Sequence, residues 1–240
     1  MPRYKIADVV FDAELMYGYT ARLCEKYLYS GSDKPEFTAV MTQKDIDAEK
    51  MQEGAEKFPD YYLESLALFR KLCDYTLSFK QGIIFHSSAV AVDGKAYLFT
   101  APSGTGKSTH ARLWREMLGD RAVMINDDKP IIRFTDGDFY VYGTPWNGKH
   151  RLDTNTRAKI AAICEIRRGK ENKIYKISPQ EMLITVMNQT IRPTETEKWD
   201  NLFFILDKLL SDVPLYRLEC DISEQASRIS YGEMVENADK

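Results

Sequence analysis

Residues 82–118 read GIIFHSSAVAVDGKAYLFTAPSGTGKSTHARLWREML. Two strand-like segments, 82–92 and 95–101, are separated only by Asp93-Gly94. An Asp-Gly pair between strands is a strong hairpin signal, because type I′ turns require positive φ at both central residues. A glycine-rich loop follows the second strand, and the pattern then predicts a helix from about residue 107 to 118. We therefore expect this hairpin, the loop and the helix to form the centre of the fold.

The loop at residues 103–109, SGTGKST, has the composition of a phosphate-binding loop. Its glycines let backbone amides turn inward around phosphate oxygens, and the dipole of the following helix favours the anion. Lys107 is expected to reach the β- and γ-phosphates of ATP or another nucleoside triphosphate, and the Ser108 hydroxyl to bind Mg²⁺. Ala101 stands where the usual motif has its first glycine, and the alternative is a glycine-rich turn with an accidental Lys-Ser pair. The predicted nucleotide-binding residues are Ser103, Gly104, Thr105, Gly106, Lys107, Ser108 and Thr109.

Two adjacent carboxylates, Asp127 and Asp128, follow a predicted strand at 122–126. Acidic residues at a strand end beside a phosphate loop can hold Mg²⁺ directly or through water. At a bend of the chain, both side chains can reach the same site. One carboxylate could then bind Mg²⁺ beside Ser108, and the other could accept the proton of an incoming hydroxyl. The alternative is a polar turn before Lys129-Pro130.

The register of the hairpin places His86 near the loop. With Asp93-Gly94 as a two-residue turn, Ser88 faces Phe99, and His86 then faces Ala101 at the mouth of the phosphate loop. A histidine in this position is a candidate for a γ-phosphate contact or a proton relay. A structural histidine with its hydrogen bonds satisfied is the competing interpretation.

A second loop carries candidate cations. Residues 143–151, GTPWNGKHR, are rich in turn formers and end in basic side chains. Lys149 and Arg151 are predicted to neutralise charge that develops on a transferring phosphoryl group, and Arg192 is a weaker candidate of the same type. A surface loop with solvated charges explains the same residues equally well.

The remaining segments predict a mixed α/β architecture. In the first eighty residues we expect strands at 4–11 and 37–41 and helices at 14–28, 43–57 and 59–79. Beyond the centre we expect strands at 130–135, 138–143, 159–167, 173–177 and 214–220, and helices beginning at Ser178-Pro179 and running over 196–211 and 222–235. Antiparallel hairpins around the loop depart from strict strand–helix alternation. We therefore predict a mixed sheet, with an α+β lobe at 1–80 and a nucleotide-binding catalytic domain at 81–240.

Composition excludes several classes of protein. The chain has 240 residues, 44% of them hydrophobic, which is enough for a core of ordinary size. Its formal net charge is −3, from 33 basic and 36 acidic residues, so no basic excess predicts a nucleic-acid partner or an anionic membrane surface. The cysteines have no metal-knuckle or CxxC spacing and are expected to be reduced and mostly buried. Without a signal-like or membrane-spanning apolar run, we expect a cytoplasmic protein.

His86, the hairpin, the loop at 101–109 and the Asp127-Asp128 pair together resemble the HPr kinase/phosphorylase family. More broadly, they resemble the phosphoenolpyruvate-carboxykinase-like fold. The resemblance covers residues 82–130 well and 131–235 loosely, and residues 1–80 do not carry it. The family's later Arg-containing, Gly-rich stretch is not found. The chain therefore looks closer to HPr-kinase-related proteins, including those that modify peptides, than to the sugar-control enzyme itself.

The resemblance implies a mixed-sheet P-loop core and ATP-dependent, Mg²⁺-dependent phosphorylation of a serine hydroxyl. Carried over, Lys107 and Ser108 bind phosphate and metal, and His86 approaches the γ-phosphate. The Asp pair supplies the metal contact and the base, with Asp128 favoured as the base and Asp127 as the metal ligand. The acceptor is open: a protein, a peptide or a small molecule with a hydroxyl group. Pyrophosphate as donor, a homo-oligomeric assembly, and a nucleotide-hydrolysing regulatory switch without an acceptor also stay open.

Overall fold

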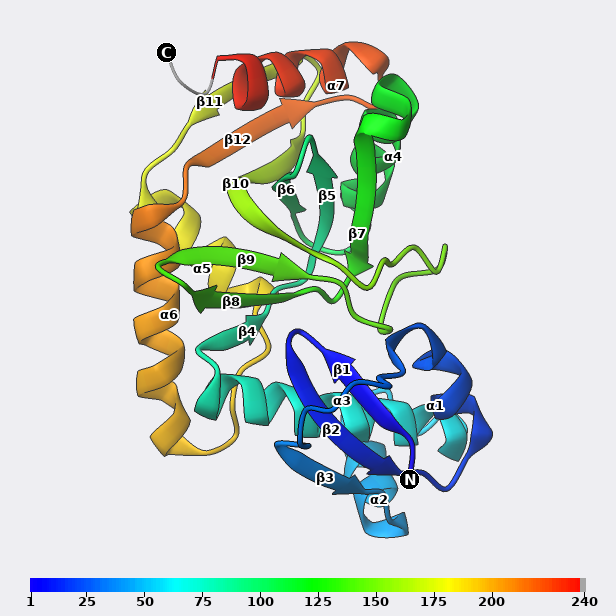
Figure 1. Cartoon of the computed structure of the whole chain (residues 1–240). Coiled ribbons are helices and arrows are strands. Elements are labelled where there is room, and N and C mark those ends of the chain that lie inside the picture. Colours follow the sequence, from blue (N-terminus) through cyan, green and yellow to red (C-terminus); the bar gives the residue numbers. More distant parts are fainter. Residues whose placement is uncertain (238–240) are drawn as a thin grey trace.

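The computed structural model describes residues 1–237 (Figure 1). Its amino-terminal part is a small sheet of order β1-β2-β3, packed beside a long helix. The elements are β1 (Arg3–Ile6), β2 (Val9–Glu14), α1 (Gly18–Leu23), β3 (Phe37–Val40), α2 (Gln43–Lys50) and α3 (Asp60–Phe79). Buried side chains recur along α3 at helical spacing, among them Leu68 and Leu72, and they pack against Tyr4 and Phe11 of the sheet.

Three predictions for this part were wrong in extent. The predicted strand at 4–11 is a hairpin, because Ala7 and Asp8 form a turn with φ of 51° and 58°. Asp8 is a residue that turns favour, but the pair lacks the glycine that makes Asp93-Gly94 a strong hairpin signal. The predicted helix at 14–28 is only α1 followed by a 3-10 turn at Glu25–Tyr27, and α2 ends at Lys50 rather than near 57.

The larger sheet carries the predicted hairpin. Its order is β4-β8-β9-β10-β6-β5-β7, with β12 pairing both β10 and β11. The strands are β4 (Gly82–Ile84), β5 (Ser87–Val92), β6 (Lys95–Thr100), β7 (Ala122–Asp128), β8 (Ile131–Thr135), β9 (Asp138–Tyr142), β10 (Arg157–Arg168), β11 (Lys173–Lys176) and β12 (Leu215–Cys220). β10 is parallel to β6 and β12, whereas the other pairs are antiparallel. The predicted mixed α/β fold is therefore confirmed.

The register of the central hairpin is the one predicted from its turn. Val92 pairs with Lys95 and Ser88 with Phe99. The predicted strand at 82–92 is nevertheless two strands, because the chain changes partners between β4 and β5. At this point the His86 amide donates to the Gln189 carbonyl at 2.6 Å, so His86 leaves the hairpin ladder.

Helices cover both faces of the larger sheet (Figure 1). On one face lie α5 (Pro179–Gln189) and α6 (Trp199–Asp212); on the other lie α4 (Lys107–Leu118) and α7 (Glu224–Tyr231). Strand β6 shows how the sequence serves both layers, since Leu98 packs with α6 residues and the next side chain, Phe99, packs with Trp114 of α4. The predicted start of α5 is confirmed by a capping box between Ser178 and Glu181.

Residues 1–80 share a core with the larger sheet. Ile84, Ile131 and Trp146 belong to the same buried cluster as Leu68 and Leu72 of α3. The small sheet is thus fixed beside the loop that follows β9. Within residues 1–237, every helix is too short or too polar to cross a membrane. The four cysteines, all within residues 1–237, are buried thiols outside any disulfide, as predicted: Cys24, Cys73, Cys164 and Cys220.

Candidate functional site

An open cleft of about 350 Å³ lies where the phosphate loop meets the end of β7. Four segments form its walls: the start of β5, the loop with the first turn of α4, the end of β7, and the loop after β9. The lining residues are His86, Ser88, Ser103, Gly104, Gly106, Lys107, Ser108, Thr109, Asp127, Asp128, Gly148, Lys149 and His150.

The phosphate loop has the backbone that its glycines predict. Gly104 and Gly106 have φ of 76° and 127°, a region that residues with a Cβ rarely adopt. α4 begins at Lys107, directly after Gly106. The first amides of a helix have no partner within the helix, and its dipole places partial positive charge at this end. The loop therefore offers an anion site at the floor of the cleft.

Lys107 is held against the loop rather than in solvent. Its Nζ donates to the Ala101 carbonyl at 2.7 Å, and the residue is 8% exposed. Burial lowers the pKa of Lys107, and the negative charges of Asp128 and Asp127 oppose that effect. The ammonium group of Lys107 is the cation at this loop that would attract the phosphates of a ligand.

A bend at the end of β7 brings both carboxylates to the cleft. The Asn126 side chain makes the bend: its Oδ1 accepts from the amides of Asp128 at 2.9 Å and Lys129 at 2.8 Å. Its Nδ2 donates to the Thr144 carbonyl at 2.8 Å, which ties the bend to the loop after β9. Asn is suited to this role because its side chain imitates a backbone turn.

Asp127 is the more buried of the pair, at 4% exposure. Its Oδ1 accepts from Ser88 Oγ at 2.5 Å, and its backbone carbonyl accepts from the Gly148 amide at 2.8 Å. A Cβ on Gly148 would lie 2.5 Å from that carbonyl oxygen, so only glycine permits this approach. Within residues 1–237, no hydrogen bond reaches Asp127 Oδ2. An ionisable oxygen without a donor, in a residue that lines the cleft with Ser108, suits the oxygen ligation that Mg²⁺ prefers.

Asp128 forms a compact charged group with its neighbours. His86 Nε2 lies 2.7 Å from Asp128 Oδ1, and Lys129 Nζ donates to Oδ2. Burial acts to raise the pKa of Asp128, but the hydrogen bond with His86 and the charge of Lys129 outweigh it and hold the pKa at about 2. Asp128 is consequently ionised at neutral pH. His86 is placed by Thr100 Oγ1, which donates to the His86 carbonyl at 3.2 Å.

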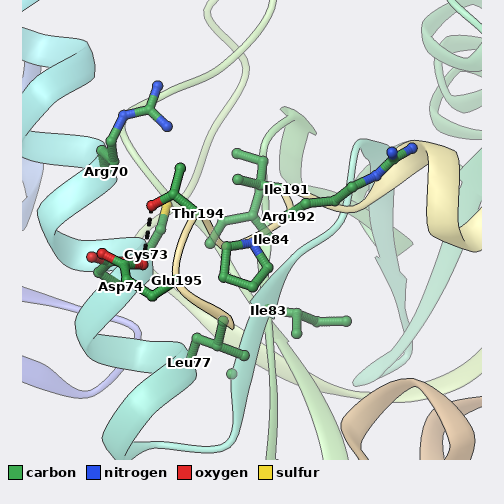
Figure 2. A pocket seen from close by; sticks show the side chains of 12 residues that line it. Arg70, Cys73, Asp74, Leu77, Ile83, Ile84, Ile191, Arg192, Thr194 and Glu195 are labelled. Carbon is green, nitrogen blue, oxygen red and sulfur yellow. Dashed lines mark hydrogen bonds between the residues drawn. The ribbon is translucent and has the colours of Figure 1, made fainter. Parts of the chain in front are cut away.

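The other predicted residues divide between the cleft and its surroundings. Lys149 lines the cleft and is exposed. Thr105 lines two neighbouring grooves instead, and Arg151 does not line the cleft. Arg192 lies elsewhere, at a small pocket between α3 and the segment after α5 (Figure 2). Among residues 1–237, no three His, Cys, Asp or Glu side chains are grouped as a metal site.

The sequence interpretation missed four residues of this region. Ser88, Gly148 and His150 line the cleft, and Arg168 of β10 donates from Nη2 to the Gly104 carbonyl at 2.6 Å. The hairpin register alone gives Ser88 a hairpin partner, Phe99, but not its second neighbour. That neighbour is Asp127, reached through the antiparallel pairing of β5 with β7.

Comparisons with known proteins add a distant likeness. No protein-family model matches the chain, and no curated protein matches it. Among solved structures, the chain is similar to the HPr(Ser) kinase/phosphatase from Coxiella burnetii, with a TM-score of 0.38 and 7% sequence identity. The match covers 64% of this chain and 97% of that chain.

Proposed function

We propose that the chain binds a nucleoside triphosphate with Mg²⁺ in the phosphate-loop cleft and transfers the γ-phosphoryl group to a hydroxyl. The acceptor would be a serine of a protein or peptide, or a small molecule. One observation carries this proposal: Asp128, paired with His86, lines the same cleft as Lys107 and Ser108. Nucleotide binding needs the loop and a metal ligand. A further carboxylate beside an imidazole supplies a base that can accept the proton of an acceptor hydroxyl.

In the proposed complex, the nucleotide phosphates contact the phosphate loop. The phosphates would lie over the amides at the start of α4, with Lys107 offsetting their charge. Ser108 and the Oδ2 atom of Asp127 are the protein oxygens suited to Mg²⁺. When bound, the metal ion would neutralise part of the charge on the β- and γ-phosphates.

In the proposed phosphoryl transfer, Asp128 acts as the base. The acceptor oxygen forms a bond to the γ-phosphorus, and the bond from that phosphorus to the bridging oxygen breaks, which releases a nucleoside diphosphate. The hydroxyl proton passes to Asp128, which is ionised at neutral pH and oriented by His86. Lys149, at the rim of the cleft, is placed to offset charge on the transferring group.

Transfer of γ-labelled phosphate from ATP with Mg²⁺ tests this function. Wild type, Lys107→Ala and Asp128→Asn are compared against cell lysate, free serine and peptide pools. Loss of one preorganised charge contact costs on the order of 100–1000-fold in rate, so Lys107→Ala should lose nucleotide affinity and labelled product. Asp128→Asn should keep nucleotide and lose transfer. Lys95→Ala is the matched control, since Lys95 is exposed at the opposite end of β6 from the loop.

Other outcomes lead to other conclusions. Label that appears only as inorganic phosphate, or stays on ATP, favours a nucleotide-dependent regulatory switch. Full activity in both Lys107→Ala and Asp128→Asn rejects the site itself.

A further inference from the structure

A groove of about 290 Å³ opens from the cleft between α4 and β7. The groove and the cleft share four lining residues: Ser108, Thr109, Asp127 and His150. Ser108 and Asp127 are the residues proposed above to bind Mg²⁺, and that ion would lie at the β- and γ-phosphates. The groove therefore begins at the end of the cleft where phosphoryl transfer would take place.

The part of the groove away from the cleft is cationic. Arg112 and Arg115 line it, and their spacing of three residues places them on the same face of α4. Within residues 1–237, the half-buried Arg115 side chain has no carboxylate partner. Arg112 Nη1 lies 2.6 Å from Glu116 Oε1, but both side chains are more than half exposed, so this pair costs little to open. The two guanidinium groups are therefore available to an anion.

The charge of the groove favours the acceptor over the nucleotide as the source of that anion. The base and ribose of a nucleotide carry no charge. Its phosphates would be held at the loop by Lys107 and by the first amides of α4. Two guanidinium groups farther along α4 would have no nucleoside charge to neutralise, whereas guanidinium groups bind carboxylates through strong, directional hydrogen bonds.

The positions of the arginines along α4 set the size of the acceptor. Arg112 and Arg115 follow Lys107 by five and eight residues, so their Cα atoms lie about 7 and 12 Å farther along the helix axis. Free serine carries its carboxylate on the same residue as its hydroxyl, and even consecutive Cα atoms are only about 3.8 Å apart. An extended chain advances about 3.3 Å per residue, so a carboxylate about two to four residues from an acceptor serine spans this separation.

We propose that this groove binds an acidic side chain of a peptide or protein acceptor, about two to four residues from the serine that receives the phosphoryl group. Arg115 makes the main contact, and Arg112 turns from Glu116 to join it. The inference rests on the proposed function, because it names the class of acceptor that the cleft would phosphorylate.

Transfer of γ-labelled phosphate from ATP to short synthetic peptides tests the inference. Each peptide has one serine and otherwise Ala and Gly, with Glu, Lys or Ala at the positions about two to four residues away on either side. The proteins are wild type, Arg115→Gln, Arg115→Glu and Arg228→Glu. Arg228 of α7 is the matched control, since it is an exposed helix arginine that contacts Glu224 and lines neither the cleft nor the groove.

We expect wild type to favour the Glu peptides over the Ala peptides about 10-fold in kcat/KM, the lower end for one hydrogen bond to a charged group. Arg115→Gln should lose most of that preference, and Arg115→Glu should favour the Lys peptides instead. A role of Arg115 in folding alone would not reverse the preference. Arg228→Glu should behave as wild type, and ATP affinity should stay within a few-fold in every variant.

The remaining outcomes separate failure of this inference from failure of the proposed function. Equal kcat/KM for all peptides in wild type, or a Glu preference that Arg115→Glu leaves unchanged, overturns the inference although transfer stands. A loss of ATP affinity in Arg115→Gln that equals its loss in kcat/KM assigns the groove to the nucleotide and also overturns it. Label on a small-molecule hydroxyl and on none of the peptides rejects a peptide acceptor alone. If wild type labels no acceptor of any kind, the proposed function fails and this inference fails with it.

Discussion

His86 Nε2 and Asp128 Oδ1 are 2.7 Å apart, and they meet at one end of the antiparallel β5–β7 pair, where His86 precedes β5 and Asp128 ends β7. The pair orients the carboxylate beside the phosphate loop. We predict that His86→Ala lowers phosphoryl transfer about 100-fold, the lower range for a proton-transfer partner. Nucleotide affinity should stay within a few-fold of wild type, because the loop amides and Lys107 are untouched.

The measurement is a single-turnover transfer rate beside an ATP titration of the same variant. His150→Ala is the matched control, since His150 also lines the cleft but is exposed and outside the Asp128 contact. An equal loss in both variants would mean that the pairing of His86 with Asp128 has no special role.

Ser88 supplies a second prediction, because its hydroxyl donates to Asp127 Oδ1 at 2.5 Å. Groups that orient a metal ligand typically affect metal affinity 10–100-fold. Ser88→Ala should therefore raise the Mg²⁺ concentration for half-maximal activity about 10-fold, with little change in rate at saturating Mg²⁺. Ser87→Ala is the control: Ser87 is equally buried on β5, but its hydroxyl donates to the Phe85 carbonyl. An unchanged Mg²⁺ requirement in Ser88→Ala would remove Asp127 from the metal site.

The sequence predicts the central hairpin and the phosphate loop because both are local. Asp93-Gly94 sets the register of β5 on β6 over a few residues, and the glycines of the loop follow directly. The Ser88–Asp127 contact depends instead on β5 pairing with β7, and α4 separates these strands in the chain. The two-residue turn fixes only the pairing of β5 with β6. It therefore places His86 at the loop without identifying Asp128 as its contact.

The amino-terminal part shows a second limit of local patterns. Residues 4–11, YKIADVVF, are apolar apart from Lys5 and Asp8, so they predict a single strand, whereas the chain turns at Ala7-Asp8. The contact between the amino-terminal part and the cleft joins residues that are far apart in the chain. Trp146, in the loop after β9, donates from Nε1 to the Ser65 carbonyl at 2.9 Å and packs on Phe69 of α3 at a ring distance of 4.6 Å. No spacing in the sequence links these residues.

A third prediction concerns this link between the amino-terminal part and the cleft loop. The buried Tyr27 hydroxyl donates to Asp153 Oδ2 at 3.0 Å, and Asn147 also donates to that carboxylate. Tyr27→Phe leaves a largely buried carboxylate short of a donor and should cost about 1–3 kcal/mol of unfolding free energy. Asn147 lies two residues before Lys149, which lines the cleft. The rate of phosphoryl transfer should therefore fall as well.

Urea unfolding and transfer rates measured on the same preparation check this link. Tyr75→Phe is the control, because the Tyr75 hydroxyl donates to Glu36 at 2.9 Å in an exposed pair, and its loss should stay within about 0.5 kcal/mol. If Tyr27→Phe matches Tyr75→Phe in both measurements, Asp153 does not need this donor.

The ion pair between Glu165 of β10 and Arg217 of β12 gives a pH-dependent prediction. Arg217 Nε donates to Glu165 Oε2 at 2.6 Å, and both side chains are largely buried. Burial acts to raise the pKa of Glu165, but hydrogen bonds from Thr185 and Arg217 outweigh it, so the pKa lies below its ordinary value of 4.5. The unfolded chain then binds this proton more readily, and the stability that Glu165 contributes is complete above about pH 5 and is lost as pH falls through the folded pKa.

Removing the partner should reverse that dependence. Arg217→Gln leaves the buried Glu165 carboxylate with the exposed Arg167 as its cationic partner and should destabilise the fold by about 1–3 kcal/mol at pH 7. The deficit should shrink towards pH 4, where the carboxylate of the variant becomes protonated and no longer needs a cation. Urea midpoints at both pH values measure it, with Arg112→Gln as the control, since Arg112 contacts Glu116 in an exposed pair. A deficit in Arg217→Gln that is the same at pH 7 and pH 4 would show that the guanidinium acts there through packing and not through its charge.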